Sequence, residues 1–152
     1  MILLNGPFES SIHTACLLTS AWPEPLDVDR LALMEHFVLF GGPDVEGIQP
    51  PIGQASTGLS TRRSNVRSGL QVLLRAGLAE TEDGGAGFRA TESAPAFVSL
   101  LESPAALKMR ATCQQAANTV GRMNDEDLVA AFAQLMLAEL RPAATHDDGT
   151  LE

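Results

Sequence analysis

Apolar residues recur at intervals of three and four positions in four stretches of the chain. Side chains separated by three or four residues lie on the same face of an α-helix, so this spacing predicts amphipathic helices. The predicted helices span about residues 7–20, 28–40, 60–76 and 125–140. Their apolar stripes are Phe8, Ile12, Ala15 and Cys16, then Leu31, Met34, Phe37 and Val38, then Val66, Leu70, Leu73 and Leu74, and finally Leu128, Phe132, Leu135 and Met136.

The residues at the predicted helix ends favour these boundaries. Pro7 suits the first turn of a helix, and Trp22-Pro23-Glu24-Pro25 ends that helix because proline removes a donor and restricts the residue before it. Short polar side chains and glycine give the next boundaries, since the former cap helix starts and the latter ends helices. We expect caps at Asp27 or Asp29 and at Ser60 or Thr61, and ends at Gly41-Gly42-Pro43 and Gly77.

Two further helices are predicted from a serine followed closely by proline. Ser93-Ala94-Pro95 predicts a short helix over about 95–101, and Ser103-Pro104 predicts a longer one over about 104–121. The acidic run 124–127 suits the first turn of the last helix, because negative charge is favourable at a helix N-terminus.

The periodicity shortens after Gly77, where residues 78–91 form two short runs around Asp83-Gly84-Gly85. This pattern predicts a small β-hairpin, with an ordinary loop as the alternative. A hairpin that directly follows the third of three helices is the element order of a winged helix-turn-helix, with helix 60–76 in the recognition position. We therefore expect a mainly α fold: a winged helix-turn-helix-like domain with a small β-hairpin wing and additional C-terminal helices.

The chain is long enough for one domain, which we place at residues 1–141. Residues 41–59 are rich in glycine and proline and predict a long ordered loop rather than a helix or strand. Residues 142–152 are polar and without periodicity, which predicts a disordered tail.

Charge limits the classes of function. The chain carries 10 Lys and Arg against 19 Asp and Glu, a formal net charge of -9, so its surface as a whole does not favour nucleic acid. It lacks a signal peptide and an apolar run long enough to span a bilayer, and we expect a soluble cytoplasmic protein. The two cysteines and three histidines have no metal-ligand spacing, so no metal or cofactor is expected.

Candidate catalytic chemistry is weak. His13 and Cys16 stand three apart on the first predicted helix and could form a base and nucleophile pair, but Cys16 belongs to the apolar stripe. Asp125, Glu126 and Asp127 are better explained by their position at a helix start than as paired catalytic carboxylates. We expect no enzyme, although a small hydrolase using Cys16 and His13 stays open.

Basic residues concentrate on the third predicted helix. Residues 60–78 contain four arginines and no acid, and Arg63, Arg67 and Gln71 fall opposite the apolar stripe. Arginines at this position suit either DNA contacts or acidic groups of a partner protein. The predicted wing carries Glu80, Glu82 and Asp83 beside Arg89, and these acids would repel DNA phosphates.

The order of these motifs resembles a known family. Pro7 and Glu9 at the first helix, Leu26 to Leu31 opening the second, and Arg62-Arg63 leading to Gly69-Leu70 and Gly77-Leu78 are similar to the middle component of bacterial ABC-three component systems, which include Lamassu-type anti-phage systems. The resemblance covers about residues 3–140.

The resemblance implies a non-enzymatic adaptor between an SMC/Rad50-like ABC ATPase and an effector such as a nuclease, with DNA reached only through the complex. Protein partners would then contact the third helix and the preceding loop. The residues expected at this partner face are Arg62, Arg63, Arg67, Gln71, Arg75, Gln49 and Pro50. The alternative function is a winged-helix transcription regulator that binds DNA as a homodimer, for which a basic wing would be the distinguishing feature.

Overall fold

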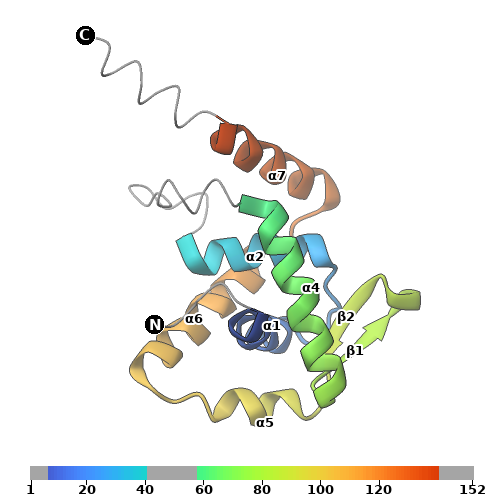
Figure 1. Ribbon diagram of the computed structural model, residues 1–152, viewed down its shortest axis with the longest axis vertical. Coiled ribbons are helices and arrows are strands. Elements are labelled where there is room, and N and C mark those ends of the chain that lie inside the picture. The colour runs from blue at the N-terminus through green and yellow to red at the C-terminus, as the bar shows by residue number, and fades with distance from the viewer. Residues whose placement is uncertain (1–6, 41–57, 141–152) are drawn as a thin grey trace.

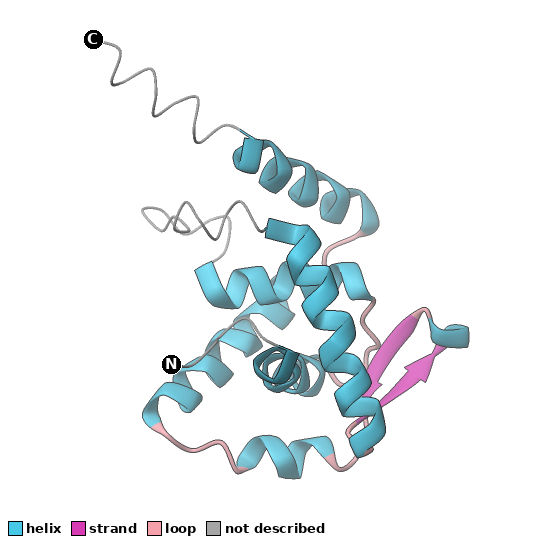
Figure 2. Cartoon of the chain, in the orientation of Figure 1, coloured by secondary structure: helices cyan, strands magenta, loops and turns pink. Residues whose placement is uncertain are grey.

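The computed structural model describes residues 7–40 and 58–140. This part of the chain is mainly helical, with one small antiparallel hairpin (Figure 2). The helices are α1 (Pro7–Ala21), α2 (Val28–Phe40), α4 (Gly58–Ala76), α5 (Ala94–Ser99), α6 (Pro104–Thr119) and α7 (Asp125–Leu140). The hairpin consists of β1 (Ala79–Glu82) and β2 (Gly87–Ala90), joined by the short 3-10 turn η1 (Asp83–Gly85). The mainly helical prediction and its hairpin are therefore confirmed, and the alternative of an ordinary loop at 78–91 is wrong.

Helix α1 lies at the centre of the molecule. In Figure 1 it is seen nearly end-on, with α2, α4, α5 and α6 around it, and it contacts each of them as well as β2. Leu17 and Leu18 are fully buried, as are Leu31 and Met34 of α2 and Val66 of α4. Helix α7 lies at one end of the molecule and packs against α4.

One part of the predicted stripe on α1 is wrong. Phe8 is 69% exposed, whereas Ser10, Ser11 and Thr14 are buried. These small side chains lie where α4 approaches α1 most closely, since a Cβ added to Gly69 would stand 2.9 Å from the backbone nitrogen of Ser11. A contact made by serine and glycine has no hydrophobic signature, so periodicity placed the buried face of this turn on the wrong side.

Several predicted caps are present. The Asp27 carboxylate accepts the Arg30 backbone N–H at 2.7 Å, and Ser103 accepts that of Ala106 at 3.1 Å. Gly77 ends α4 with φ 76°, and the Leu78 N–H donates to the Leu73 carbonyl at 2.9 Å, which is the hydrogen bond of a Schellman motif. The start of α4 differs from the prediction, because the helix begins at Gly58 and includes Ser60 and Thr61.

The hairpin pairs Ala79 with Ala90 and Glu82 with Gly87, in antiparallel register. A third segment joins it: Leu26, between α1 and α2, exchanges backbone hydrogen bonds of 2.8 and 2.9 Å with Phe88. This pairing ties β2 to the start of α2, so the hairpin, α2 and α4 surround a common space. Periodicity could not predict it, because a single paired residue forms no alternating pattern.

Two predicted segments, the loop at 41–59 and the tail at 142–152, lie outside the described residues apart from Gly58 and Leu59, which belong to α4. Within the described ranges, none of the helices combines the length and the apolar composition that crossing a membrane requires.

Candidate functional site: the arginine face of helix α4

Three of the predicted partner residues form a row along α4. Arg67, Gln71 and Arg75 are spaced four apart and are all exposed, so they share one face of the helix. Within residues 7–40 and 58–140, no carboxylate forms an ion pair with Arg67 or Arg75. The guanidinium groups of Arg67 and Arg75 therefore form no ion pair with the described residues and can contact a partner.

Arg62 does not belong to that face. It is 3% exposed, and its guanidinium lies 3.3 Å from the Glu35 carboxylate, which is 1% exposed. Position 62 is one turn before Val66 and two before Leu70, so the helix turns it inward with the apolar stripe. The expectation that Arg62 contacts a partner is corrected: its counterion is inside this molecule.

In addition to Arg62 of α4, Glu35 has a neighbour on α1. His13 Nδ1 lies 3.2 Å from the other Glu35 oxygen, so the carboxylate stands between one residue of α1 and one of α4. His36, next to Glu35 on α2, packs against Phe40 with the two rings tilted by 57°, and burial together with the positive charge of Arg62 lowers the pKa of this imidazole. The cluster His13–Glu35–Arg62 thus joins three helices in the core, and sequence spacing within any one helix could not reveal it.

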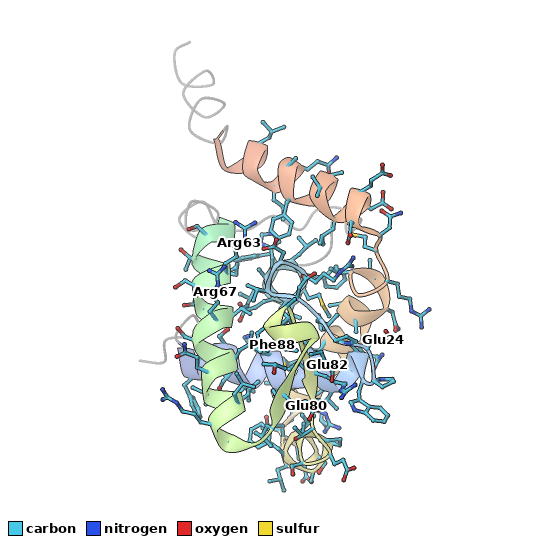
Figure 3. The ribbon with its side chains drawn as sticks, turned by 90° about the vertical axis from the view of Figure 1, so that its right-hand side faces the viewer. Glu24, Arg63, Arg67, Glu80, Glu82 and Phe88 are labelled. Atoms are coloured by element: carbon cyan, nitrogen blue, oxygen red, sulfur yellow. The ribbon has the colours of Figure 1, made fainter. Side chains whose placement is uncertain are left out.

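Arg63 occupies the border between the exposed row and the interior. Its side chain is 37% exposed, its Nε donates to Asp29 at 2.8 Å, and its guanidinium lies 5.0 Å from the centre of the Phe132 ring (Figure 3). This cation–π contact helps to hold α7 on α4. Arg63 therefore already contacts both Asp29 of α2 and Phe132 of α7 within the chain.

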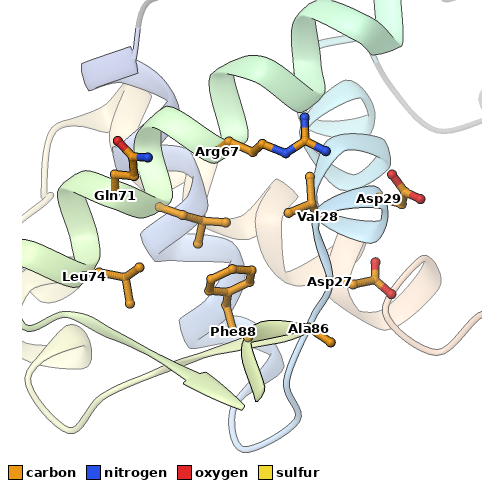
Figure 4. A pocket seen from close by; sticks show the side chains of 10 residues that line it. Asp27, Val28, Asp29, Arg67, Gln71, Leu74, Ala86 and Phe88 are labelled. Carbon is orange, nitrogen blue, oxygen red and sulfur yellow. The ribbon is translucent and has the colours of Figure 1, made fainter. Parts of the chain in front are cut away.

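A hollow opens beside the exposed row, between α4, the start of α2 and the hairpin turn (Figure 4). Its volume is about 600 Å³ and it is open to solvent on one side. Buried Leu70 and half-buried Val28, Leu74 and Phe88 provide apolar lining. Arg67 and Gln71 stand on the α4 side of the opening, and Asp27 and Asp29 on the α2 side.

The hairpin beside the hollow carries acidic side chains, as expected. Glu80 and Glu82 both form ion pairs with Arg89, the Glu80 oxygen at 2.7 Å (Figure 3). The hydrogen bond to Glu80, together with the negative charge of both glutamates, raises the pKa of Arg89. Because two carboxylates share one guanidinium, the group formed by Glu80, Glu82 and Arg89 carries a net negative charge.

The two residues considered for a hydrolase have different partners. His13 is bound to Glu35, whereas Cys16 lies beside Cys113 of α6, and both thiols are buried and free. Cys113 donates to the Met109 sulfur at 3.7 Å, and the neighbouring Cys16 thiol together with burial raises the pKa of Cys113. Cys16 borders a hollow between α1 and α6 that His13 does not line, and the hydrogen-bond partner of the His13 ring is Glu35 rather than this thiol.

The acidic run before α7 has the structural role expected of it. Asn124 accepts the Asp127 backbone N–H at 2.7 Å and so caps the helix, and Asp125 pairs with Arg30 of α2 at 3.1 Å. Gln49 and Pro50, also expected at the partner face, lie outside the described residues.

Comparison with known proteins identifies the family. A family model described as "ABC-three component (ABC-3C) system Middle Component 2" matches residues 3–141. Neither the curated proteins nor the solved structures gave a match. Because the family model spans almost the entire chain, from before α1 to the end of α7, this protein belongs to the Middle Component 2 family of ABC-three component systems.

Proposed function

We propose that this chain is a non-enzymatic cytoplasmic adaptor that bridges an SMC/Rad50-like ABC ATPase and an effector, which we expect to be a nuclease, in a Lamassu-like anti-phage defence complex. Membership of a middle-component family implies protein partners, because such a component acts within a system of several proteins. The identities of the ATPase and the effector, and the bridging itself, are the proposal.

The observation that carries this proposal is the exposed row on α4. Arg67, Gln71 and Arg75 are presented to solvent, whereas the neighbouring Arg62 and Arg63 are held by Glu35 and Asp29. A planar guanidinium forms geometrically specific hydrogen bonds with carboxylates, which makes such a row suited to a protein interface.

We also propose that the fold is a winged helix used for protein contact. Its support is the element order α1, Leu26, α2, α4, β1 and β2, with Leu26 paired to β2 and α4 directly followed by the hairpin. In this arrangement α4 has the position of a recognition helix and the hairpin that of a wing. The pairing of His13 with Glu35 rather than with Cys16 supports the non-enzymatic part of the proposal.

A co-purification experiment tests the adaptor function. The chain is co-expressed with the ABC ATPase and effector encoded beside its gene, and each component is quantified after affinity capture of this chain. We expect wild type to retain both, and the double reversal Arg67→Glu/Arg75→Glu to lose at least one by about tenfold or more, as for charged contacts within an interface. Lys108→Glu changes an exposed charge on α6 and serves as the matched control.

Capture of neither component by wild type would contradict the adaptor function. Unchanged capture with the double reversal would instead show that the α4 row is not the contact face. Circular dichroism of each variant establishes that the fold is retained, which we expect because exposed substitutions usually change stability little.

The second candidate is a DNA-binding regulator acting as a homodimer, favoured by the same element order. The hairpin counts against it, because Glu80 and Glu82 lie where a DNA-binding wing needs positive charge, and they already engage Arg89.

A further inference from the structure

The hollow beside α4 combines an apolar lining with one arginine that forms no ion pair with any of the described residues. Leu70 is 2% exposed at its base, and Phe88 and Leu74 present half-buried side chains toward the same space (Figure 4). Its volume of about 600 Å³ lies within the usual range of binding pockets, roughly 300–1,000 Å³. It can therefore accept apolar side chains of a partner.

The charges around the opening are not equivalent. Asp27 caps α2 by accepting the Arg30 N–H at 2.7 Å and also lies near the Arg30 guanidinium, at 3.8 Å. Asp29 accepts from Arg63 at 2.8 Å. In contrast, Arg67 has no such carboxylate partner among the described residues. Each acid of the rim thus has a basic partner within the chain, and Arg67 is the charged residue of the rim that the described contacts leave available to a partner.

We infer that this hollow docks a short amphipathic segment of a protein partner, which inserts an apolar side chain against Leu70 and Phe88 and places a carboxylate on Arg67. This inference rests on the proposed adaptor function and gives its contact face a specific partner chemistry. The positive charge of Arg67 favours a carboxylate on the partner, and the apolar lining of the hollow favours an apolar side chain.

A peptide fits this site better than an extended polyanion does. A single carboxylate can reach Arg67 while the rest of the segment stays apolar, whereas a nucleic-acid backbone carries phosphates at regular short intervals. Among the described residues that line the opening, only Arg67 is basic, so a second phosphate laid beside the first would find no positive side chain there.

Two paired substitutions test the site in the complex formed by the full chain with its ABC ATPase and effector. Arg67→Glu reverses the arginine at the opening, and Arg122→Glu makes the same change at an exposed arginine between α6 and α7, outside both the hollow and the α4 row. Ala86→Trp fills the hollow from the exposed hairpin turn, and Ala105→Trp adds the same bulk at an exposed position of α6, outside the hollow. We expect Arg67→Glu and Ala86→Trp to weaken binding of one component by about tenfold or more, and the two controls to change it by less than about threefold.

A crosslinking step identifies the occupant. A photo-reactive phenylalanine analogue replaces Gln71, which stands at the opening, and the crosslinked residue is mapped by mass spectrometry. We expect a partner segment with an Asp or Glu within one turn or two strand positions of a large apolar residue. Changing that carboxylate to arginine should restore binding to the Arg67→Glu variant.

The outcomes separate this inference from the adaptor function. If the Arg67→Glu and Ala86→Trp variants both bind the components as tightly as wild type does, the docking site would be overturned while the adaptor function would stand. Crosslinks to a second copy of this chain, to a basic segment or to DNA would also overturn it. Failure of wild type to join either component would overturn both.

Discussion

Glu35 is a carboxylate buried between two basic side chains. Arg62 and His13 reach it from α4 and α1 at 3.3 and 3.2 Å. Moving a charge out of water costs several kcal/mol, and the attraction of its partners offsets this only while both remain. The cluster should therefore matter less for net stability than for the way it couples three helices.

Removing one partner should reveal this coupling. We expect Arg62→Met to lower the free energy of unfolding by about 3–5 kcal/mol, because it leaves Glu35 buried beside His13 alone. The double variant Glu35→Leu/Arg62→Met should regain at least half of that loss, since it removes both buried charges. Urea unfolding followed by circular dichroism measures these two variants and the single variant Glu35→Leu against wild type.

The double variant could instead lose as much free energy of unfolding as Glu35→Leu and Arg62→Met lose together. That result would contradict this account, because charges that interact do not contribute independently. Arg63→Met is the matched control. It removes a half-exposed ion pair with Asp29 and the contact with Phe132, so its cost should stay nearer 1–2 kcal/mol.

At the scale of elements, the contact between α1 and α4 shows which features of the packing could be predicted from the sequence and which could not. The spans of both helices were predicted to within two residues, because spacing, prolines and the Gly77 end are local signals. The face by which they meet was missed at its closest point, where Ser10, Ser11 and Gly69 replace the expected apolar residues. Close approach of two backbones requires small side chains, and these carry no hydrophobic pattern.

Gly69 provides the test of that contact. Alanine is favoured over glycine within a helix by about 1 kcal/mol, so propensity alone predicts that Gly69→Ala stabilises the protein. Its Cβ would instead stand 2.9–3.1 Å from backbone atoms of Ser10 and Ser11, which cannot move aside as a flexible side chain would. We expect a net loss of about 1–2 kcal/mol in the free energy of unfolding.

Ser64→Ala, at an exposed position of the same helix, is the control and should change stability by no more than about 0.5 kcal/mol. A stabilised Gly69→Ala variant would mean that α1 and α4 are farther apart than this packing requires.

At the scale of the whole molecule, the distribution of charge separates the two candidate functions. The net charge is -9, the hairpin is acidic, and α4 presents only Arg67 and Arg75 as exposed arginines. Protein partners can match such a local pattern. Duplex DNA requires positive charge over a wider surface, because each phosphate contact adds to affinity.

We therefore expect the isolated chain to pass through heparin without retention at about 0.15 M salt, where interactions beyond roughly 8 Å are screened. A 20-base-pair duplex should show no shift at low salt, whereas a homodimeric regulator would bind it with a steep salt dependence. The measurement is an electrophoretic shift assay from 0.02 to 0.2 M salt, with Glu80→Lys/Glu82→Lys as a variant whose hairpin carries positive charge. Strong binding by wild type would favour the regulator instead.

The amino-acid sequence by itself determined the helices, most of their ends, the hairpin and the acidic character of that hairpin, because each follows from local spacing and chain chemistry. The ion-pair partners of Arg62 and Arg63 were decided only by tertiary structure: these neighbours contact Glu35 in the core and Asp29 at the surface. The hollow likewise depends on Leu26 pairing with Phe88, which brings the hairpin beside α2 and α4. Periodicity defines which residues share a face, but only long-range packing decides what covers that face and which charges it leaves without a partner.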